Sequence, residues 1–185
     1  MFSDSSEVLK FIKDTDVKFL DIRSTDLPGV QQHFNNPAST VDEEFFSVGQ
    51  LFDGSSIRGF ANIHESDMQL IPDVTTAYVD PFRTERTLIM VFDIYNPRTG
   101  EIYAKDPRQV AKKAEKYLAS TGIADTAFFA PEAEFYIFDD VRYSVTQNQS
   151  FYSVDSEEGA WNTGRVEEGG NLANKTPFKG GYFPV

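Results

Sequence analysis

The sequence predicts an α+β fold, with a mostly β domain followed by the beginning of a second domain. Three observations support this fold class. Short β-rich segments separated by turn residues continue to about residue 104, a helix with clear start and stop signals follows, and the composition becomes loop-like after residue 140. We therefore expect a first domain over residues 1–104 and an incomplete second domain over residues 105–185.

The N-terminal segment predicts a helix and then a hairpin. Residues 5–13 follow a region rich in Ser and Asp and place their apolar side chains on one helix face. Residues 17–23 alternate and are rich in β-formers, residues 26–29 are a turn signal, and residues 30–34 can return as a second strand.

The middle of the chain predicts a short helix and several strands. Residues 42–49 form the expected helix, which ends at a glycine, and residues 51–60 contain an Asp-Gly turn that suits a positive φ. The expected strands are 77–79 and 87–94, of which the apolar run 88–92 belongs to the core; after a turn at 96–100, residues 101–104 can pair back.

The second domain is expected to begin with a helix and a strand. Asp106 caps a helix that has Pro107 in its first turn and runs to about residue 119, with an apolar face of Val110, Ala114, Tyr117 and Leu118. Residues 127–138 read as a long apolar strand, and residues 142–176 have the composition of a loop.

Composition and charge limit the possible functions. The chain has 29 acidic and 17 basic residues, a net charge of −12, and no cysteine. An acidic surface repels nucleic acid and anionic lipid, so neither is an expected partner. The absence of cysteine excludes disulfides, thiolate metal sites and cysteine nucleophiles. With no signal peptide and no apolar run that could span a bilayer, a cytoplasmic location is expected.

Glu132 and Glu134 are the strongest candidates for chemistry. Alternation along the predicted strand places both on one face, about 7 Å apart at a rise of about 3.3 Å per residue. Their repulsion is about 2 kcal/mol at an effective dielectric near 20, and a divalent cation would offset it. Mg²⁺ and Mn²⁺ prefer such oxygen ligands. The alternative is a solvated strand face with two ordinary glutamates.

The Asp53-Gly54 turn is the second candidate. It could present the Asp53 carboxylate to a polar ligand, with Ser55 and Ser56 hydrogen-bonding the loop backbone. A hairpin turn without chemistry is the alternative interpretation. The two histidines, His33 and His64, have no ligand spacing and are expected to be surface or structural residues.

Five stretches, taken in order and with their spacing, resemble the glutamine synthetase family. They cover nearly the whole chain, and the polar stretch 142–176, with Trp161-Asn162, is similar to the long loop of the bacterial type I form. The stretches are Phe52-Asp53-Gly54-Ser55-Ser56-Ile57, Glu65-Ser66-Asp67-Met68, residues 120–126, Pro131-Glu132-Ala133-Glu134-Phe135 and Lys179-Gly180-Gly181-Tyr182-Phe183-Pro184.

The resemblance implies a β-grasp N-terminal domain and the beginning of a catalytic domain. It implies that Glu132 and Glu134 are metal ligands, one for each of two Mg²⁺ or Mn²⁺ ions. It implies that Asp53 and Ser56 belong to an ammonium site, delivered from the β-grasp domain of a neighbouring subunit, where Asp53 binds and deprotonates ammonium. Tyr182 would line the same site.

The implied reaction activates glutamate with ATP to γ-glutamyl phosphate, which ammonia then attacks. The implied assembly is a homo-oligomer, a double hexameric ring in the full-length protein. The remaining metal ligands, the glutamate-binding arginines and most ATP contacts are expected beyond Val185, so this chain alone is expected to be inactive. Two alternatives remain: a related glutamate–amine ligase of the same superfamily, and a non-catalytic β-grasp assembly module.

Overall fold

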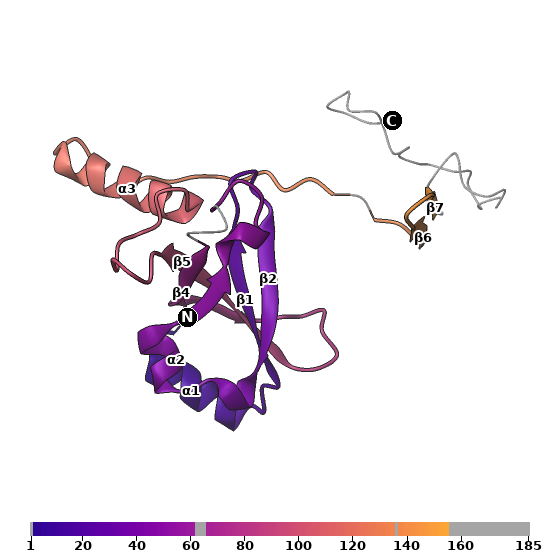
Figure 1. Cartoon of the computed structure of the whole chain (residues 1–185), viewed down its shortest axis with the longest axis horizontal. Helices are drawn as coiled ribbons and strands as arrows, with labels where there is room; N and C mark the ends of the chain where they lie inside the picture. Colours follow the sequence, from indigo (N-terminus) through magenta and orange to yellow (C-terminus); the bar gives the residue numbers. More distant parts are fainter. Residues whose placement is uncertain (1, 62–65, 136, 156–185) are drawn as a thin grey trace. The chain divides into compact units, whose positions relative to one another are not determined.

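The computed structural model describes residues 2–61, 66–135 and 137–155. The chain divides into two compact units, residues 1–128 and 129–185. The first unit contains a five-stranded mixed sheet with helices, which confirms the predicted α+β class (Figure 1). Among the described residues, no helix combines the length and the apolarity needed to cross a bilayer.

Side-chain hydrogen bonds at their N-termini fix where the first two helices begin, and both helices form in the predicted regions. In α1 (Ser5–Asp14) the Asp4 carboxylate accepts a hydrogen bond from the Glu7 backbone N–H at 2.9 Å. In α2 (Glu43–Val48) the Asp42 carboxylate accepts from the Phe45 N–H at 2.9 Å. Gly49 ends α2 at a φ of 79°, a left-handed conformation that favours glycine.

The sheet has the order β2-β1-β5-β4-β3, in which β1 and β5 pair in parallel and the other pairs are antiparallel. The predicted hairpin is confirmed as β1 (Phe19–Thr25) and β2 (Gln31–Pro37). The remaining strands are β3 (Gln50–Asp53), β4 (Asp67–Val79) and β5 (Thr87–Tyr95). A short 3₁₀ turn, η1 (Ala38–Thr40), links β2 to α2.

Strand β4 is much longer than the predicted strand 77–79, because it begins at Asp67. Its register shifts between Asp73 and Tyr78, and such an irregularity interrupts the alternation by which a strand is recognised in sequence. Residues 101–104 pair back through a single bridge, between Tyr95 and Ile102.

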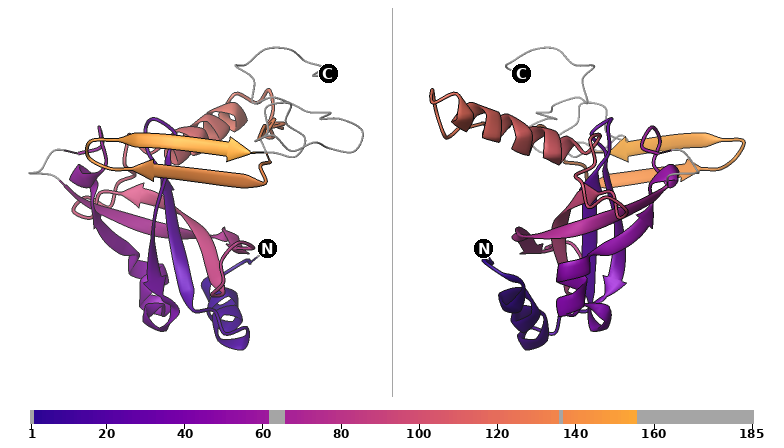
Figure 2. Two further views of the ribbon diagram at one scale, coloured as in Figure 1. Left: turned by 90° about the vertical axis from the view of Figure 1, so that its right-hand side faces the viewer. Right: turned by 60° about the vertical axis from the view of Figure 1, so that its left-hand side comes forward.

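The core lies on one face of the sheet, beneath α1 and α2. Of the predicted core run on β5, Leu88, Met90 and Phe92 belong to this core, and Phe45 of α2 meets Phe92 edge-on with ring centroids 6.0 Å apart. Figures 1 and 2 show α1 and α2 together at one end of the sheet and α3 (Pro107–Ser120) at the other. Fully buried core side chains include Val8, Leu20, Ile22, Leu70, Leu88, Met90, Phe92 and Ile94.

The sheet curls until its two edge strands approach each other. Strands β2 and β3 are at opposite ends of the strand order. Nevertheless, the Asn36 amide of β2 donates a hydrogen bond to the Gln50 side chain of β3 at 3.1 Å. Twisted strands allow such curvature, and the curl creates a seam between the two edges.

Helix α3 forms as predicted, but its predicted apolar face is exposed in the structure. Val110 and Tyr117 are largely exposed, while Gln109 is buried. Charged side chains attach α3 to the sheet instead: Arg108 donates to Asp73 at 2.6 Å, and Lys112 pairs with Asp93. The buried Asp106 carboxylate accepts from the backbone N–H groups of Ile94 and Arg108, each at 2.9 Å.

Two predictions for the chain after α3 are wrong. Residues 127–135 form no strand, because no described strand supplies the backbone partners that a sheet requires. The predicted loop 142–176 contains most of a hairpin, β6 (Asp140–Val145) and β7 (Ser150–Asp155), visible in Figure 2. The alternation of Val141, Tyr143 and Val145 is the sequence signal that indicates strand β6. The rest of the predicted loop, after residue 155, lies outside the described part of the chain.

We predict that Arg108→Ala destabilises the first unit by about 1–3 kcal/mol, because it leaves the carboxylates of Asp73 and Asp93 short of a cation partner. Lys113→Ala is the matched control, since Lys113 is an exposed residue of the same helix. Urea unfolding followed by circular dichroism measures both variants. Equal stability of the two variants would contradict the structural role of Arg108.

Candidate functional site

Asp53 ends β3 and is held by the turn that follows it, η2 (Gly54–Ser56). Its Oδ1 accepts hydrogen bonds from the Ser55 backbone N–H at 2.9 Å and from the Ser55 hydroxyl at 2.6 Å. The Ser56 hydroxyl donates to Asp53 Oδ2 at 3.2 Å. The serines therefore bind the carboxylate, where the sequence had predicted bonds to the loop backbone.

Position 54 requires glycine because there is no space for a side chain. The prediction of a positive φ at this position is wrong, because Gly54 does not adopt a positive φ. Gly54 is buried, and its N–H donates to the Ser66 carbonyl at 2.7 Å. An added Cβ would lie 2.7 Å from Met68 Cγ and 3.2 Å from the Ser66 oxygen. A side chain at this position would push β3 and β4 apart and move Asp53.

The Asp53 carboxylate is stabilised as an anion. The Ser55 hydroxyl, followed by the Ser55 backbone N–H, lowers the pKa of Asp53 below its ordinary value of 3.8, and Ser56 and Ser66 add weaker effects in the same direction. Asp53 itself is exposed. The turn thus presents a fixed negative charge to whatever occupies the space in front of it.

A cavity of about 260 Å³ lies at the seam between the sheet edges, and Asp53 and Ser56 both line it. The structure therefore brings together two of the residues chosen from the sequence. Phe52 and Leu70 supply apolar walls, and His33 of β2 supplies a further polar group. The lining residues are Ser24, Gln32, His33, Phe34, Phe52, Asp53, Ser56, Ile57 and Leu70.

Sequence reasoning gave His33 no role at this cavity. Its Nδ1 lies 2.9 Å from Oδ1 of Asp21, a carboxylate that is completely buried, and Arg23 Nε donates to the other oxygen of Asp21 at 2.8 Å. The spacing of the two histidines could not reveal this pairing, because it depends on the register between β1 and β2. The other histidine, His64, lies outside the described residues.

Glu132 and Glu134 are exposed and lie in a segment without strand structure. Their oxygen ligands suit a hard divalent cation, but two carboxylates are too few for a six-ligand shell. Among the described residues, no group of three potential ligands is assembled. Tyr182, the remaining predicted site residue, lies outside the described part of the chain.

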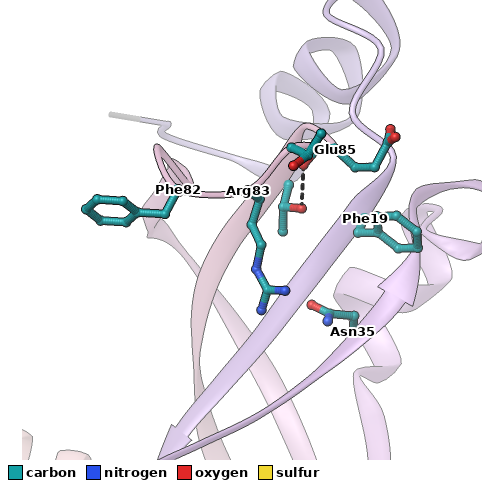
Figure 3. A pocket seen from close by; sticks show the side chains of 7 residues that line it. Phe19, Asn35, Phe82, Arg83 and Glu85 are labelled. Atoms are coloured by element: carbon teal, nitrogen blue, oxygen red, sulfur yellow. Dashed lines mark hydrogen bonds between the residues drawn. The ribbon is translucent and has the colours of Figure 1, made fainter. Parts of the chain in front are cut away.

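A larger cavity, of about 530 Å³, lies near the start of β5. It is lined by Phe19, Asn35, Phe82, Arg83, Thr84, Glu85 and Thr87. Figure 3 shows the Phe82 ring projecting away from Phe19 and Asn35, and Phe82 is 94% exposed. None of the residues chosen from the sequence lines this cavity, so the smaller cavity beside Asp53 is the better candidate site.

Comparison with known proteins matches both parts of the chain to one family. The glutamine synthetase β-grasp domain matches residues 16–97, and the glutamine synthetase catalytic domain matches residues 104–185. Glutamine synthetase of Frankia alni is 60% identical over 185 residues, and that of Streptomyces coelicolor is 62% identical over 185 residues. The chain is matched completely in both, but spans 39% and 38% of their lengths.

A solved structure agrees with these matches. Glutamine synthetase of Plasmodium falciparum superposes with a TM-score of 0.65 and 26% identity, over 84% of this chain and 30% of that one. The combined matches cover the sheet, the Asp53 turn and the segment containing Glu132 and Glu134. The chain belongs to the glutamine synthetase family, of which it contains the β-grasp domain and the beginning of the catalytic domain.

Proposed function

We propose that this chain is the N-terminal part of an ATP-dependent glutamate–ammonia ligase, and that Asp53 and Ser56 bind the ammonium substrate. The observation that carries this proposal is the Asp53 carboxylate, held as an anion by Ser55 beside a small cavity. Such a cavity suits a small cation with hydrogen-bond donors. In the proposed reaction, ATP converts glutamate to γ-glutamyl phosphate, and ammonia then displaces the phosphate.

The low pKa of Asp53 bears on the two roles that the resemblance implies for it. A carboxylate that is stabilised as an anion binds a cation well but accepts a proton poorly. In this chain the hydrogen bonds of the turn therefore favour binding of ammonium over its deprotonation. We propose binding as the primary role of Asp53.

Glu132 and Glu134 are proposed to provide one ligand each to two Mg²⁺ or Mn²⁺ ions, with further ligands from outside the described residues. Divalent ions supply charge stabilisation for phosphoryl transfer when they are bound. The carboxylate oxygens of Glu132 and Glu134 are ligands that such ions prefer, which supports this assignment. Tyr182 is proposed to line the ammonium site.

We also propose the assembly that the family implies, a homo-oligomer arranged as a double hexameric ring in the cytoplasm. In it, Asp53 would serve the active site of a neighbouring subunit. Glutamate, ammonium and ATP are the proposed partners, and the acidic composition gives no support for nucleic acid or an anionic membrane. The β-grasp domain is proposed to end near residue 104, where the match to the catalytic domain begins.

The first prediction from the proposed function tests the shared site by mixing subunits. The test protein is a chimera in which this chain replaces the matching residues of the Streptomyces coelicolor relative. Asp53→Ala and Glu134→Ala should each lower glutamine formation about 100-fold or more. Rings that contain both variants should regain activity, because some interfaces then pair two intact halves.

The controls for this test are rings assembled from a single variant and a polyamine assay. No regain after proven co-assembly would contradict the shared site. Polyamine turnover in place of ammonia turnover would favour the related glutamate–amine ligase.

The second prediction is that the 185-residue chain alone forms no glutamine. Two metal-ligand carboxylates cannot organise phosphoryl transfer without the remaining ligands and the glutamate contacts. The measurement is ATP-dependent glutamine formation by protein purified free of host enzyme. Turnover that disappears in Glu134→Ala would show that the catalytic unit is smaller than proposed.

The third prediction concerns the anion at position 53. Ser55→Ala removes the hydroxyl that contributes most to the lowered pKa of Asp53, so that pKa should rise toward 3.8. A lowered folded-state pKa adds stability above pH 3.8 that is lost as the pH falls through the folded value, and the variant should lose part of it. Carboxyl ¹³C chemical shifts between about pH 2 and 6 measure the change.

The control for this titration is Ser47→Ala, which removes a hydroxyl that bonds the Glu44 carbonyl on α2. It should leave the Asp53 titration unchanged. An unshifted Asp53 pKa in Ser55→Ala would mean that this hydroxyl does not stabilise the anion.

A further inference from the structure

The cavity beside Asp53 includes a histidine that none of the expectations drawn from the sequence assigned to a ligand. His33 lines the cavity together with Asp53 and Ser56. Its ring is anchored from behind by Asp21, whose carboxylate is completely buried and also accepts from Arg23. A side chain held in this way has a fixed orientation, whereas an exposed histidine on an edge strand is ordinarily free to rotate.

Strand register places His33 opposite Asp53 across the seam. The Asn36–Gln50 hydrogen bond joins β2 to β3, and the strand pairings make these two strands run in opposite directions. His33 lies three residues before Asn36, and Asp53 lies three residues after Gln50. Because the strands are antiparallel, three residues backward on β2 and three residues forward on β3 run in the same direction along the seam. His33 and Asp53 are therefore opposite each other across the seam.

Alternation also places His33 and Asp53 on one face of the sheet. Phe34 is opposite Ile22 of the core, so its neighbour His33 faces the other side. Phe52 packs against the core beside Met68, so its neighbour Asp53 likewise faces the other side. The two polar side chains therefore share the outer face of the two edges that the curl brings together.

His33 and Ser56 each have an acceptor left for a ligand, because their donors already bond Asp21 and Asp53, whereas the Asp53 carboxylate is largely occupied. Hydrogen bonds from Ser55 and Ser56 occupy three of the four lone-pair sites of the Asp53 carboxylate, and the Ser66 side chain is a further donor, so Asp53 has little capacity left for a ligand. The Ser56 hydroxyl hydrogen points to Asp53, which leaves its lone pairs. In the neutral His33 ring, Nδ1–H donates to Asp21, and Nε2 is then an acceptor without a partner among the described residues.

Acceptors of this kind suit a cation and not an anion, and a cation that carries several N–H donors can form a hydrogen bond with each of them. Ammonium has four such donors in a tetrahedral arrangement, and Asp53 alone can accept at most one of them. We infer that His33 is a third ammonium-binding residue, whose Nε2 accepts a hydrogen bond from the cation held by Asp53 and Ser56, and that Asp21 positions the ring for this contact. The inference rests on the proposed function and deepens it.

The competing explanation is that His33 is present only to satisfy buried Asp21. His33→Asn separates the two explanations, because an Asn side chain keeps an N–H donor near the position of Nδ1 but has no counterpart of Nε2. A purely structural His33 would be replaced by Asn without loss of ammonium binding.

The experiment uses the 185-residue chain and ¹⁵N NMR of its two imidazoles, assigned with a His64→Gln variant. We expect neutral His33 to be the Nδ1–H tautomer, and its Nε2 signal to move in a saturable manner with ammonium chloride at constant ionic strength. Potassium chloride is the matched control, because potassium is of similar size but has no N–H donors. Asp53→Ala should abolish the response.

The outcomes distinguish this inference from the proposed function. If the Asp53 carboxyl signal responds to ammonium while His33 Nε2 does not, the role of His33 is overturned and the proposed site stands. If neither signal responds, the chain binds no ammonium at this cavity by itself and the inference is overturned, whereas the proposed function is tested separately by the mixed rings. An equal response to potassium would show a general cation effect and would also overturn the inference.

Kinetics of the chimera provide a second readout. His33→Asn should raise the KM for ammonium about tenfold, the effect of losing one hydrogen bond to a charged group, while the KM values for ATP and glutamate stay unchanged. Asn35→Ala, two residues further along the same face of β2, is the matched control and should leave all three KM values unchanged. An unchanged ammonium KM in His33→Asn would contradict the inference.

Discussion

The approach of the two sheet edges is the constraint on which the candidate site depends. A flat five-stranded sheet would separate β2 from β3 by three intervening strands. The curl instead brings them close enough for Asn36 to bond Gln50. Residues of β2 and β3, which do not pair with each other in the sheet, thereby line one cavity.

The candidate site also depends on a buried carboxylate. Burying a charge is unfavourable unless it is paired and hydrogen-bonded, and Asp21 is completely buried on β1, the neighbour of the edge strand β2. Arg23 and His33 satisfy its two oxygens. Asp21 thus links β1 to the edge strand β2, and the cost of its burial is offset by the same contacts that fix the His33 ring.

Features that depend on neighbouring residues in the sequence were predictable. Asp4 and Asp42 cap helices by local hydrogen bonds, and Gly49 ends α2 by its backbone conformation, so all three signals lie within a few residues of their effect. Asp53 belongs to this class too, because Ser55 and Ser56 hold it from within one turn. Its selection from the sequence required no knowledge of the tertiary structure.

Features that depend on distant partners were not predictable from the same patterns. The periodicity of α3 indicated an apolar buried face, but the charges of Arg108 and Lys112 find carboxylates on β4 and β5 and decide which face meets the sheet. The pairing of His33 with Asp21 likewise follows from strand register. A pattern within one segment contains no information on which segment will lie beside it.

The same distinction separates the two halves of the proposed active site. The Asp53 half is built entirely from β3, its turn and the adjoining sheet, so its charge and orientation are set within the first unit. The half with Glu132 and Glu134 needs a strand partner to fix which way the two carboxylates point, and no described strand supplies one. The Asp53 half is therefore the part whose geometry is set within the first unit, whereas the geometry of the proposed metal half depends on what pairs with the segment that contains Glu132 and Glu134.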